Sequence, residues 1–420
     1  MTTTSQTSGP MTSERLLQRF LRYVAIDTTA NDETSDYPSS PGQWVLGSLL
    51  MEELKSMGWT DVSQDTHGLV VATLESNVAG PAPTVVFNSH LDTSPEMPGR
   101  DVRPQVIRNY AGGDIQLPNG TAVIRVADNE ELTELLGCTL ITTDGNTLLG
   151  GDDKAGLAIL MELAERLREQ PVPHGRIRLL FTCDEEIGRG VQHVDLERLE
   201  GQVCYTIDGP SAGQVDVETF SADLVTMVFR GVNIHPSIAK GRMVNALKAA
   251  GSFLDRLPRQ ELSPETTSDR EGFLHPYSLS GGVAEATLKV LLRDFDTPQL
   301  RVHEGRLRVL ADEVIGQFPG LAIDVHVTAQ YRNLGDGLAK EPRAVQFAEQ
   351  AYERLQLPCQ RSIIRGGTDG SRLTELGLPT PNLSSGQHNP HSNLEWACLD
   401  EMEQTVQVLR ELIQLWAASG

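Results

Sequence analysis

The sequence predicts an α/β fold in which a mostly parallel sheet carries helices on both faces and a ferredoxin-like α+β (βαββαβ) domain is inserted into the chain. Two observations lead to this prediction. Before residue 209, short apolar runs typical of buried strands alternate with helical patterns. After residue 217, the expected elements follow the order β-α-β-β-α-β, which is typical of the ferredoxin-like unit.

The first part of the chain is expected to open with an amphipathic helix. Ser13 can cap this helix, and apolar residues recur at helical spacing from Leu16 to Val24. The expected elements that follow are a helix over 42–57, strands over 69–74 and 84–88, a helix over 154–169, and strands over 176–182 and 203–207.

The middle of the chain has a pattern of its own. Its expected elements are a strand over 218–230, a helix over 243–257, strands over 272–280 and 283–294, a helix over 298–317, and a strand over 321–331. A helix over 342–355 then returns to the α/β style. The sequence therefore predicts a discontinuous domain over 11–216 and 332–420, an inserted domain over 217–331, and a disordered Thr/Ser-rich tail over 1–10.

The composition excludes several classes of partner. The 420 residues include 35 basic and 57 acidic side chains, and the resulting net charge of −22 repels nucleic acids and anionic membranes. No apolar run reaches the length of a membrane helix and the N-terminus lacks a signal-peptide pattern, so we expect a cytoplasmic protein without membrane contact. The five scattered cysteines include no Cys-x-x-Cys pair, which indicates reduced thiols rather than disulfides or a thiolate metal site.

Acidic residues and histidines follow three of the expected buried strands. The strand over 84–88 leads into Ser-His-Leu-Asp-Thr at 89–93, the strand over 176–182 leads to Asp-Glu-Glu at 184–186, and the strand over 203–207 leads into Asp208. The carboxyl ends of parallel strands meet at one edge of a sheet, so these clusters should converge in one cleft. Negative charge gathered at the ends of apolar strands needs a compensating cation.

Two further clusters complete the pattern. Gly-Gly-Asp-Asp-Lys at 150–154 stands at the start of the long helix, and His-Asn-Pro-His at 388–391 lies in a polar loop. His90 and Asp92 are alternate residues, so Asp92 can accept a hydrogen bond from His90 and fix its tautomer while the other ring nitrogen binds a metal. Taken singly, these motifs are weak: a lone histidine such as His90 is more often a surface or core residue than a ligand, and Glu185 and Glu186 are equally compatible with a solvated pair at a helix start.

Several stretches resemble the M20 metallopeptidases, and within that family the tripeptide aminopeptidases. The matching stretches occur in the family's order over nearly the whole chain. They are Ser-His-Leu-Asp-Thr at 89–93, Asn-Tyr-Ala-Gly-Gly-Asp-Ile at 109–115, Leu-Leu-Gly-Gly-Asp-Asp-Lys-Ala-Gly at 148–156, Phe-Thr-Cys-Asp-Glu-Glu-Ile-Gly at 181–188, Asn-Ile-His-Pro at 233–236, Ile-Arg-Gly-Gly-Thr-Asp-Gly at 364–370, and the loop of His391.

The resemblance implies two zinc ions per subunit and a set of site residues. Asp152 would bridge the two ions, His90 and Asp208 would complete the ligands of one, and Glu186 and His391 would complete those of the other. Glu185 would be the general base, and Asp92 would be the hydrogen-bond partner of His90. The choice of Glu185 over Glu186 as base, and of Asp152 over Asp153 as bridge, rests on the order of residues in the family.

Three further residues are implied as substrate contacts. His235, in the inserted domain, would hold the carbonyl oxygen of the scissile bond, which would make catalysis depend on closure of that domain as a lid. Arg365 is a candidate to clamp the terminal carboxylate of a peptide. Arg293 is a second candidate, for which a structural ion pair with a neighbouring acid is an equal alternative.

The function implied is that of a zinc-dependent exopeptidase that removes the N-terminal residue of short peptides, chiefly tripeptides. Two alternatives stay open. The same site could serve an M20-type deacylase or carboxypeptidase acting on acyl-amino acids or dipeptides, or the chain could be a catalytically silent peptide-binding protein. The family also offers a homodimer formed through the inserted lid domain as a possible assembly.

Overall fold

The structure, a computed structural model, describes residues 10–420 and divides into two compact units. Unit 1 comprises the described residues up to Val217 together with Gly337–Ser362 and Leu376–Gly420, and unit 2 comprises Glu218–Asp336 and Ile363–Glu375. Unit 2 thus takes in two short stretches, 332–336 and 363–375, that lie outside the insertion expected over 217–331. The expected tail over 1–10 falls outside the described residues except for Pro10, which begins the first helix.

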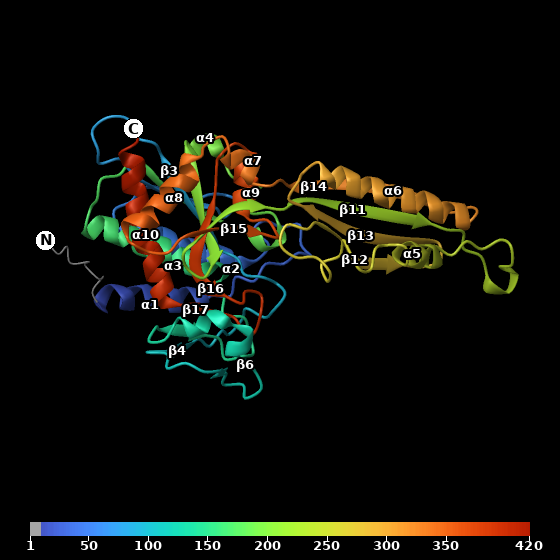
Figure 1. Ribbon diagram of the computed structural model, residues 1–420, viewed down its shortest axis with the longest axis horizontal. Coiled ribbons are helices and arrows are strands. Elements are labelled where there is room, and N and C mark those ends of the chain that lie inside the picture. Colours follow the sequence, from blue (N-terminus) through green and yellow to red (C-terminus); the bar gives the residue numbers. More distant parts are fainter. Residues whose placement is uncertain (1–9) are drawn as a thin grey trace. The chain divides into compact units, whose positions relative to one another are not determined.

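Unit 1 is built from a large sheet and the helices around it (Figure 1). Its helices are α1 (Pro10–Val24), α2 (Pro41–Ser56), α3 (Gly151–Glu169), α4 (Leu196–Leu199), α8 (Arg343–Arg354) and α10 (Leu399–Ala417). Its strands are β1 (Thr60–Gln64), β2 (Val70–Leu74), β3 (Val85–His90), β4 (Gln105–Ile107), β5 (Ile115–Gln116), β6 (Val123–Ile124), β7 (Leu140–Thr142), β8 (Ile177–Thr182), β9 (Val203–Pro210), β16 (Asn382–His388) and β17 (Trp396–Cys398).

The centre of the sheet is parallel and its flanks are antiparallel. The strand order is β1-β2-β8-β3-β9-β16-β17-β7-β4, and parallel pairing joins β8, β3, β9 and β16. The strands on either side pair in antiparallel fashion, and β5 pairs with β6 in a small separate ladder. Two strands reach across the unit boundary: β10 (Gln214–Thr219), which pairs with β16, and β15 (Gln360–Ile364), which pairs with β10. The predicted α/β class with a parallel central sheet is confirmed.

The two central strands β3 and β8 end at the same level of the sheet. Every residue of both strands is buried, as their apolar sequences require, and His90 at the end of β3 pairs in register with Thr182 at the end of β8. The polar residues that follow these strands therefore emerge at one edge. This common edge is where the candidate site forms.

Helix α3 lies in the middle of the helical layer on one side of the sheet. It packs against β3, β9 and β16 and also against α1 and α10, so most of its side chains are buried. Its first residues, Gly151 to Asp153, are not regular helix, because Asp152 and Asp153 have non-helical backbone angles. The regular part begins near Lys154, where the helix was expected to start.

Unit 2 is a four-stranded antiparallel sheet with two main helices, in the predicted βαββαβ order. Its elements are β11 (Ser221–Arg230), η4 (Pro236–Ile238), α5 (Ala246–Leu254), β12 (Phe273–Gly281), β13 (Glu285–Asp294), α6 (Gln299–Gln317), β14 (Ala322–Tyr331), α7 (Gly335–Leu338, which ends in unit 1) and α9 (Asp369–Glu375). The strand order is β12-β13-β11-β14. The single strand expected over 218–230 is two strands, β10 and β11.

The core of unit 2 follows from alternation along its strands. In β11 the buried residues Val225, Met227 and Phe229 alternate with partly exposed ones, so one face of the sheet is apolar. That face packs against α5 and α6, which contribute Phe253 and Leu307 to the same core. The unit therefore has a hydrophobic core of its own.

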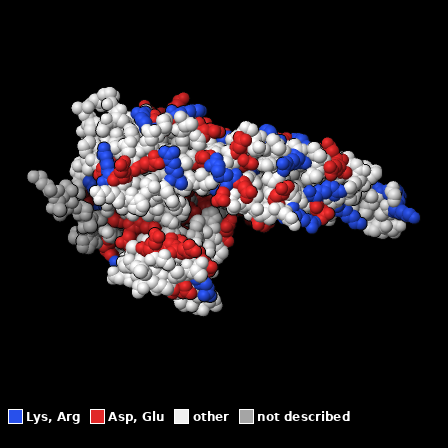
Figure 2. All heavy atoms as spheres, viewed as in Figure 1, with Lys and Arg blue, Asp and Glu red and all other residues white. Residues whose placement is uncertain are grey.

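Among the described residues 10–420, no helix combines the length and apolar character that a membrane crossing requires. On the face drawn in Figure 2, Asp and Glu side chains gather in a band over unit 1, in keeping with the net charge of −22.

Candidate functional site

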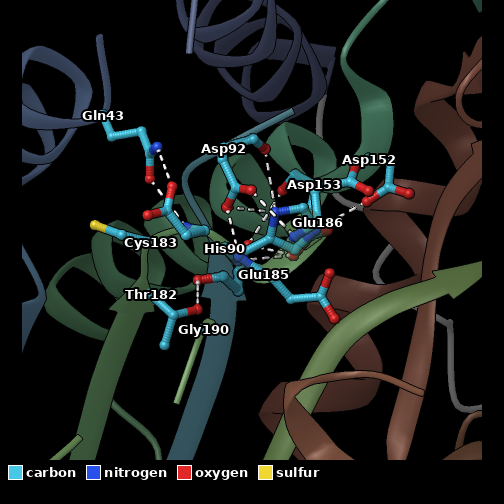
Figure 3. A network of polar contacts seen from close by, with 12 residues as sticks. Gln43, His90, Asp92, Asp152, Asp153, Thr182, Cys183, Glu185, Glu186 and Gly190 are labelled. Carbon is cyan, nitrogen blue, oxygen red and sulfur yellow. Dashed lines mark hydrogen bonds and ion pairs between the residues drawn. The ribbon is translucent and has the colours of Figure 1, made fainter. Parts of the chain in front are cut away.

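The candidate site collects side chains from five separate segments at the edge of the unit 1 sheet. His90 is the last residue of β3, Asp152 stands in the turn that opens α3, and Glu186 lies in the 3-10 helix η3 (Glu185–Ile187) after β8. Asp208 belongs to the end of β9, and His391 lies in the loop after β16. Figure 3 shows that His90, Asp152 and Glu186 face one another at this edge.

Asp152 lies between the two histidines. Its Oδ1 atom is 2.9 Å from His90 Nε2, and its Oδ2 atom is 3.3 Å from His391 Nε2. His391 Nε2 also lies 2.8 Å from Glu186 Oε2, and Asp208 Oδ1 lies 3.9 Å from His90 Nε2. The structure thus brings together all five predicted ligands, with one oxygen of Asp152 directed at each histidine.

Two overlapping groups of ligand atoms are close enough to hold metal ions. The ligand atoms of His90, Asp152 and Glu186 all lie within 4.8 Å of one another, and so do those of His90, Asp153 and Asp208. Asp152 and Asp153 are therefore both candidates for a metal ligand at this edge.

The contacts of the two aspartates differ. Asp153 is fully buried, and its Oδ2 atom accepts a 2.5 Å hydrogen bond from Ser89 Oγ and a 3.3 Å bond from the backbone N–H of His90. Its Oδ1 atom accepts from the backbone N–H of Gly156 at 3.2 Å. The protein already satisfies both oxygens of Asp153, whereas both oxygens of Asp152 face the histidines.

Asp92 holds the histidine and both glutamates. Its backbone oxygen lies 3.1 Å from His90 Nδ1 and its carboxylate Oδ1 lies 3.4 Å from the same nitrogen. The two carboxylate oxygens accept hydrogen bonds from the backbone N–H groups of Glu185 at 3.0 Å and Glu186 at 3.1 Å. The sequence suggested the contact with His90, but the contacts with the η3 backbone emerge only in the structure.

The site concentrates negative charge in a buried place. Burial, reinforced by the charge of Asp152, raises the pKa of Glu186 to about 7, and burial together with Asp152 and Asp153 raises the pKa of Asp208 well above its usual value. Burial lowers the pKa of His391, but its contacts with Asp152 and Glu186 outweigh that effect and raise this pKa to about 11. The raised pKa values of Glu186, Asp208 and His391 all reflect this concentration of negative charge.

The residues at this edge fit divalent metal ions of the zinc type. Imidazole nitrogens and carboxylate oxygens are ligands that such ions accept. Glu186 Oε1 is buried, and no residue among 10–420 donates a hydrogen bond to it. A buried carboxylate oxygen without a donor is unfavourable, and a bound cation would satisfy it.

Glu185 is set apart from the five ligands. It is half-buried and begins η3, and its charge contributes to the raised pKa of Asp208, which places it close to the cluster. Its neighbour Glu186 has a side chain only 4% exposed and contacts His391. The two adjacent glutamates therefore stand in different environments.

Two acidic residues that sequence reasoning missed hold the backbone of the site. Glu395 is fully buried, and its carboxylate accepts hydrogen bonds from the backbone N–H groups of Leu149 at 2.6 Å, Gly150 at 2.8 Å and Asp152 at 3.1 Å. Gly150 has a φ of +81°, which a residue with a side chain rarely adopts, so glycine is required in this turn. Glu395 thereby fixes the turn that presents Asp152.

Asp184 anchors the segment that carries Glu185 and Glu186, as Glu395 anchors the turn of Asp152. Its carboxylate accepts hydrogen bonds from Ser39 N at 2.8 Å, Ser39 Oγ at 2.5 Å and Gln43 Nε2 at 2.7 Å. The acidic triplet at 184–186 hinted at a shared role, but the anchoring of Asp184 to residues before β1 has no local signal in the sequence.

Two of the predicted substrate contacts, His235 and Arg365, lie in unit 2 and have different surroundings. His235 is on an exposed loop at the start of η4, where its Nδ1 atom lies 2.7 Å from Ser237 Oγ. The guanidinium of Arg365 donates to the backbone oxygens of Asp269 and Glu271 and to Thr267, and it lies over the ring of Phe220. These bonds use most of its donors.

Arg293 has fewer partners than Arg365. Its guanidinium lies over the ring of Tyr331, 4.9 Å from the ring centre, and burial lowers its pKa to about 10. Its Nη1 atom is buried without an acceptor among residues 10–420, and no acid of that range forms an ion pair with it. The structural ion pair that the sequence left open is therefore not present in the described chain.

His388, the other histidine of the C-terminal loop, lies apart from the ligand groups. It is 2.7 Å from Glu401 Oε2 and 3.3 Å from Glu131 Oε1, and its ring stacks on Trp396. These contacts give it a structural role in the core of unit 1.

Comparisons with known proteins agree on one family. Residues 141–415 match the model of peptidase family M20/M25/M40. The chain is 41% identical over 408 residues to peptidase T of Salmonella paratyphi A, which covers 97% of this chain and all of that one. Its structure is similar to the crystal structures of a tripeptidase from Staphylococcus aureus subsp. aureus Mu50 (TM-score 0.74, 25% identity) and of aminopeptidase PepT from Bacillus cereus ATCC 10987 (TM-score 0.73, 23% identity), each covering 97% of this chain and 99% of the other.

Proposed function

The chain belongs to the M20 peptidase family, and on this basis we propose that it is a metal-dependent aminopeptidase that removes the N-terminal residue of short peptides, chiefly tripeptides. The family predicted from the sequence motifs is thereby confirmed. One observation carries the proposal: Asp152 directs one carboxylate oxygen to each of two histidines, which in turn lie beside Asp208 and Glu186. This arrangement suits a pair of metal ions that share one carboxylate.

The proposed cofactor is two zinc ions. His90 and Asp208 would hold one ion, Glu186 and His391 would hold the other, and Asp152 would contact both. Three carboxylates supply a charge of −3 against +4 for two divalent ions, and a shared hydroxide makes the sum zero. When bound, such a pair lowers the pKa of a shared water and polarises the substrate carbonyl.

Glu185 is the proposed general base. Its carboxylate would accept the proton of the attacking water and later donate it to the leaving amine, as a half-buried acid beside the cluster can do. Asp92 supports this role because it binds the backbone N–H of Glu185 and orients His90 at the same time. The supporting observation is the difference between the buried, His-bonded Glu186 and the half-buried Glu185.

Two residues of unit 2 are proposed as substrate contacts. Arg293 is the better candidate to clamp the terminal carboxylate of a peptide, because its buried Nη1 atom has no acceptor in the described chain whereas Arg365 is bonded to a neighbouring loop. His235 is proposed to hold the scissile carbonyl oxygen, and its exposure leaves it available for that contact.

Two other functions were considered from the sequence. An M20-type deacylase or carboxypeptidase would use the same cluster on a substrate whose amine is blocked. A catalytically silent peptide-binding protein would not need the base, yet Glu185 and all five ligands are present. The identity of 41% to a peptidase T over the full length favours the aminopeptidase.

The experiment that tests the proposal compares blocked and free peptides. The purified protein is supplied with zinc and incubated with a tripeptide, its N-acetylated form and its C-terminal amide. We expect rapid release of the first residue from the free tripeptide and none from the N-acetylated form. Cleavage of the acetylated peptide would identify the deacylase or carboxypeptidase instead, and loss of cleavage with the amide would support a carboxylate clamp.

The homodimer through unit 2 is also a proposal, and it rests on the family resemblance alone. It predicts a mass of twice 45.9 kDa in sedimentation or light scattering, which a monomer would contradict. The cytoplasmic location expected from the sequence also stays a proposal.

A further inference from the structure

Two cysteines that are far apart in the sequence meet in unit 1, away from the predicted peptidase residues. Cys138 precedes β7, and Cys398 ends β17, the antiparallel neighbour of β7. The sulfur atoms of both residues and a carboxylate oxygen of Asp400 all lie within 4.8 Å of one another. None of these residues belongs to the five predicted ligands.

Hydrogen bonds connect the backbone segments that carry Cys138, Cys398 and Asp400. Cys398 pairs in register with Leu140, and the N–H of Leu399 donates to the oxygen of Thr139 at 2.9 Å. The N–H of Thr139 donates in turn to Asp400 Oδ2 at 2.8 Å. These bonds turn the Asp400 carboxylate toward the segment that carries Cys138.

The two thiols interact with each other. The Cys398 thiol donates a hydrogen bond to Cys138, which lowers the pKa of Cys138, and the same bond together with burial raises the pKa of Cys398. Cys398 is the N-cap residue of the 19-residue helix α10, whose N-terminal dipole favours negative charge. The helix end therefore favours negative charge at Cys398, which a thiolate bound to a cation would supply.

The cluster of Cys138, Cys398 and Asp400 is apolar on one side and exposed to solvent on the other. Cys398 is fully buried and packs in an apolar cluster that includes Trp396, Leu140 and Leu132, and Cys138 packs against the same cluster. Asp400 is exposed. An ion could thus enter past Asp400 and be held by the half-buried sulfur of Cys138 and the buried sulfur of Cys398.

We propose that Cys138, Cys398 and Asp400 bind one thiophilic divalent cation of the zinc type, separate from the predicted peptidase site. Two sulfur ligands and one carboxylate leave a fourth position for a water, and sulfur ligands select zinc-like ions over magnesium or calcium. Binding forms two sulfur–metal bonds and one oxygen–metal bond and releases the two thiol protons to solvent. The bound ion would join the start of β7 to the first turn of α10.

The test uses the full-length protein with its five cysteines reduced and with zinc supplied at two equivalents per chain, enough for the predicted peptidase site but not for a third site. Cadmium ion is titrated in, and the ultraviolet absorption of thiolate-to-cadmium charge transfer is recorded. We expect this absorption to saturate at one cadmium ion per chain. The predicted peptidase ligands include no sulfur, so cadmium bound to them adds nothing to this signal.

Variants separate the cluster from the other thiols. Cys138→Ser should lose the absorption while keeping peptidase turnover, which also reports that the variant is folded. Cys359→Ser, which changes a partly buried thiol outside the cluster, should keep it. Asp400→Asn preserves an acceptor for the Thr139 N–H but removes the charge, and it should weaken cadmium binding by more than about tenfold.

Three results would overturn the proposal. One is a reduced wild-type chain without the charge-transfer absorption, and another is a Cys138→Ser chain that keeps it. The third is unchanged cadmium affinity in Asp400→Asn, a variant of an exposed residue that is usable even if the cysteine variants do not fold. If the two thiols formed a disulfide and bound no cadmium, the charge-transfer absorption would be absent, and this result too would overturn the proposal.

Discussion

Glu185 and Glu186 are adjacent in sequence, yet their side chains have different neighbours. Glu186 has a nearly inaccessible carboxylate, with one oxygen against His391 and the other without a donor in the described chain. Glu185 is half-buried and carries its charge beside Asp208. These surroundings support the proposal that Glu186 is a metal ligand and Glu185 the general base.

Replacing the proposed base should separate metal binding from turnover. We expect Glu185→Gln to retain about two metal ions per chain and to lose roughly 10²- to 10⁴-fold in kcat, because general-base catalysis contributes about that much. Metal analysis and steady-state kinetics on a tripeptide measure the two quantities. Glu186→Gln is the matched control and should lose metal as well as turnover. A Glu185→Gln enzyme with wild-type kcat would exclude this residue as the base.

Removing the support beneath Asp152 should weaken the site without removing a ligand. Glu395→Gln places an amide NH₂ where a carboxylate oxygen now faces backbone N–H groups, so the turn at 149–152 would lose hydrogen bonds. We expect metal affinity to fall by about 10- to 100-fold, measured by competition with a chelator. Glu134→Gln, at an exposed position, should leave affinity unchanged. Equal affinity in both variants would contradict this role for Glu395.

Among single residues, the sequence identifies those whose role is marked by a pattern in the neighbouring residues. His90, Asp152 and Asp208 follow or precede buried elements, so their convergence at one sheet edge could be predicted. Glu395 could not, because its partners lie 243 to 246 residues away and its own neighbourhood has no motif. The pairing of Cys138 with Cys398 was missed for the same reason.

Among the elements, long apolar strands were easier to predict than short ones. The strand expected over 176–182 became β8 (Ile177–Thr182) and the one over 84–88 became β3 (Val85–His90), because continuous apolar runs mark buried strands. Strands such as β5 and β6, with two residues each, are too short for any periodicity. Such strands depend on their neighbours in space, which the local sequence does not specify.

The packing of α1, α3 and α10 depends on a buried ionic cluster. Glu162 of α3 is fully buried and accepts hydrogen bonds from Arg15 at 2.7 and 2.9 Å, Arg19 at 2.5 Å and Arg166 at 2.9 Å. Arg166 also binds both carboxylate oxygens of Glu403 in α10. One carboxylate therefore balances guanidinium groups from two helices.

Neutralising Glu162 should destabilise the protein strongly. Glu162→Gln removes the one fully buried carboxylate that Arg15, Arg19 and Arg166 share, while each of them keeps a second, more exposed carboxylate partner. We therefore expect a loss of about 3 kcal/mol in the free energy of unfolding, at the low end of the cost of breaking a buried ion pair. Glu169→Gln removes another partner of Arg15, but one that is exposed, and should cost less than about 1 kcal/mol. Denaturant unfolding of both variants measures the difference. Similar losses in the two would mean that burial does not govern this cluster.

Across unit 1, the proposed metal ions would connect segments that are far apart in the sequence. Their five ligands come from β3, the start of α3, η3, β9 and the loop after β16, so bound metal favours only the folded arrangement. Without metal, Asp152, Glu186 and Asp208 are held close together, and the raised pKa values of Glu186 and Asp208 reflect the cost of their negative charges there. Stability and activity should therefore depend on metal together.

Removal of metal should lower the melting temperature as well as abolish peptidase activity. Ligand binding to the folded state alone contributes about 2.7 kcal/mol when free ligand is at 100 times its Kd. We expect a chelator to lower Tm by the shift that corresponds to this loss of free energy, and we expect added zinc to restore Tm. Calorimetry measures both changes. His391→Asn should show a smaller zinc-induced rise. An unchanged Tm in a chain proven free of metal would contradict this link.

The position of β16 (Asn382–His388) at the centre of the sheet has a consequence for how the protein is made. This strand lies between β9 and β17, but its residues are among the last to leave the ribosome, after the whole sheet of unit 2. At roughly 5–20 residues per second, β9 waits many seconds with an apolar, unpaired edge. Newly made chains should therefore need protection from aggregation until the C-terminal segment arrives.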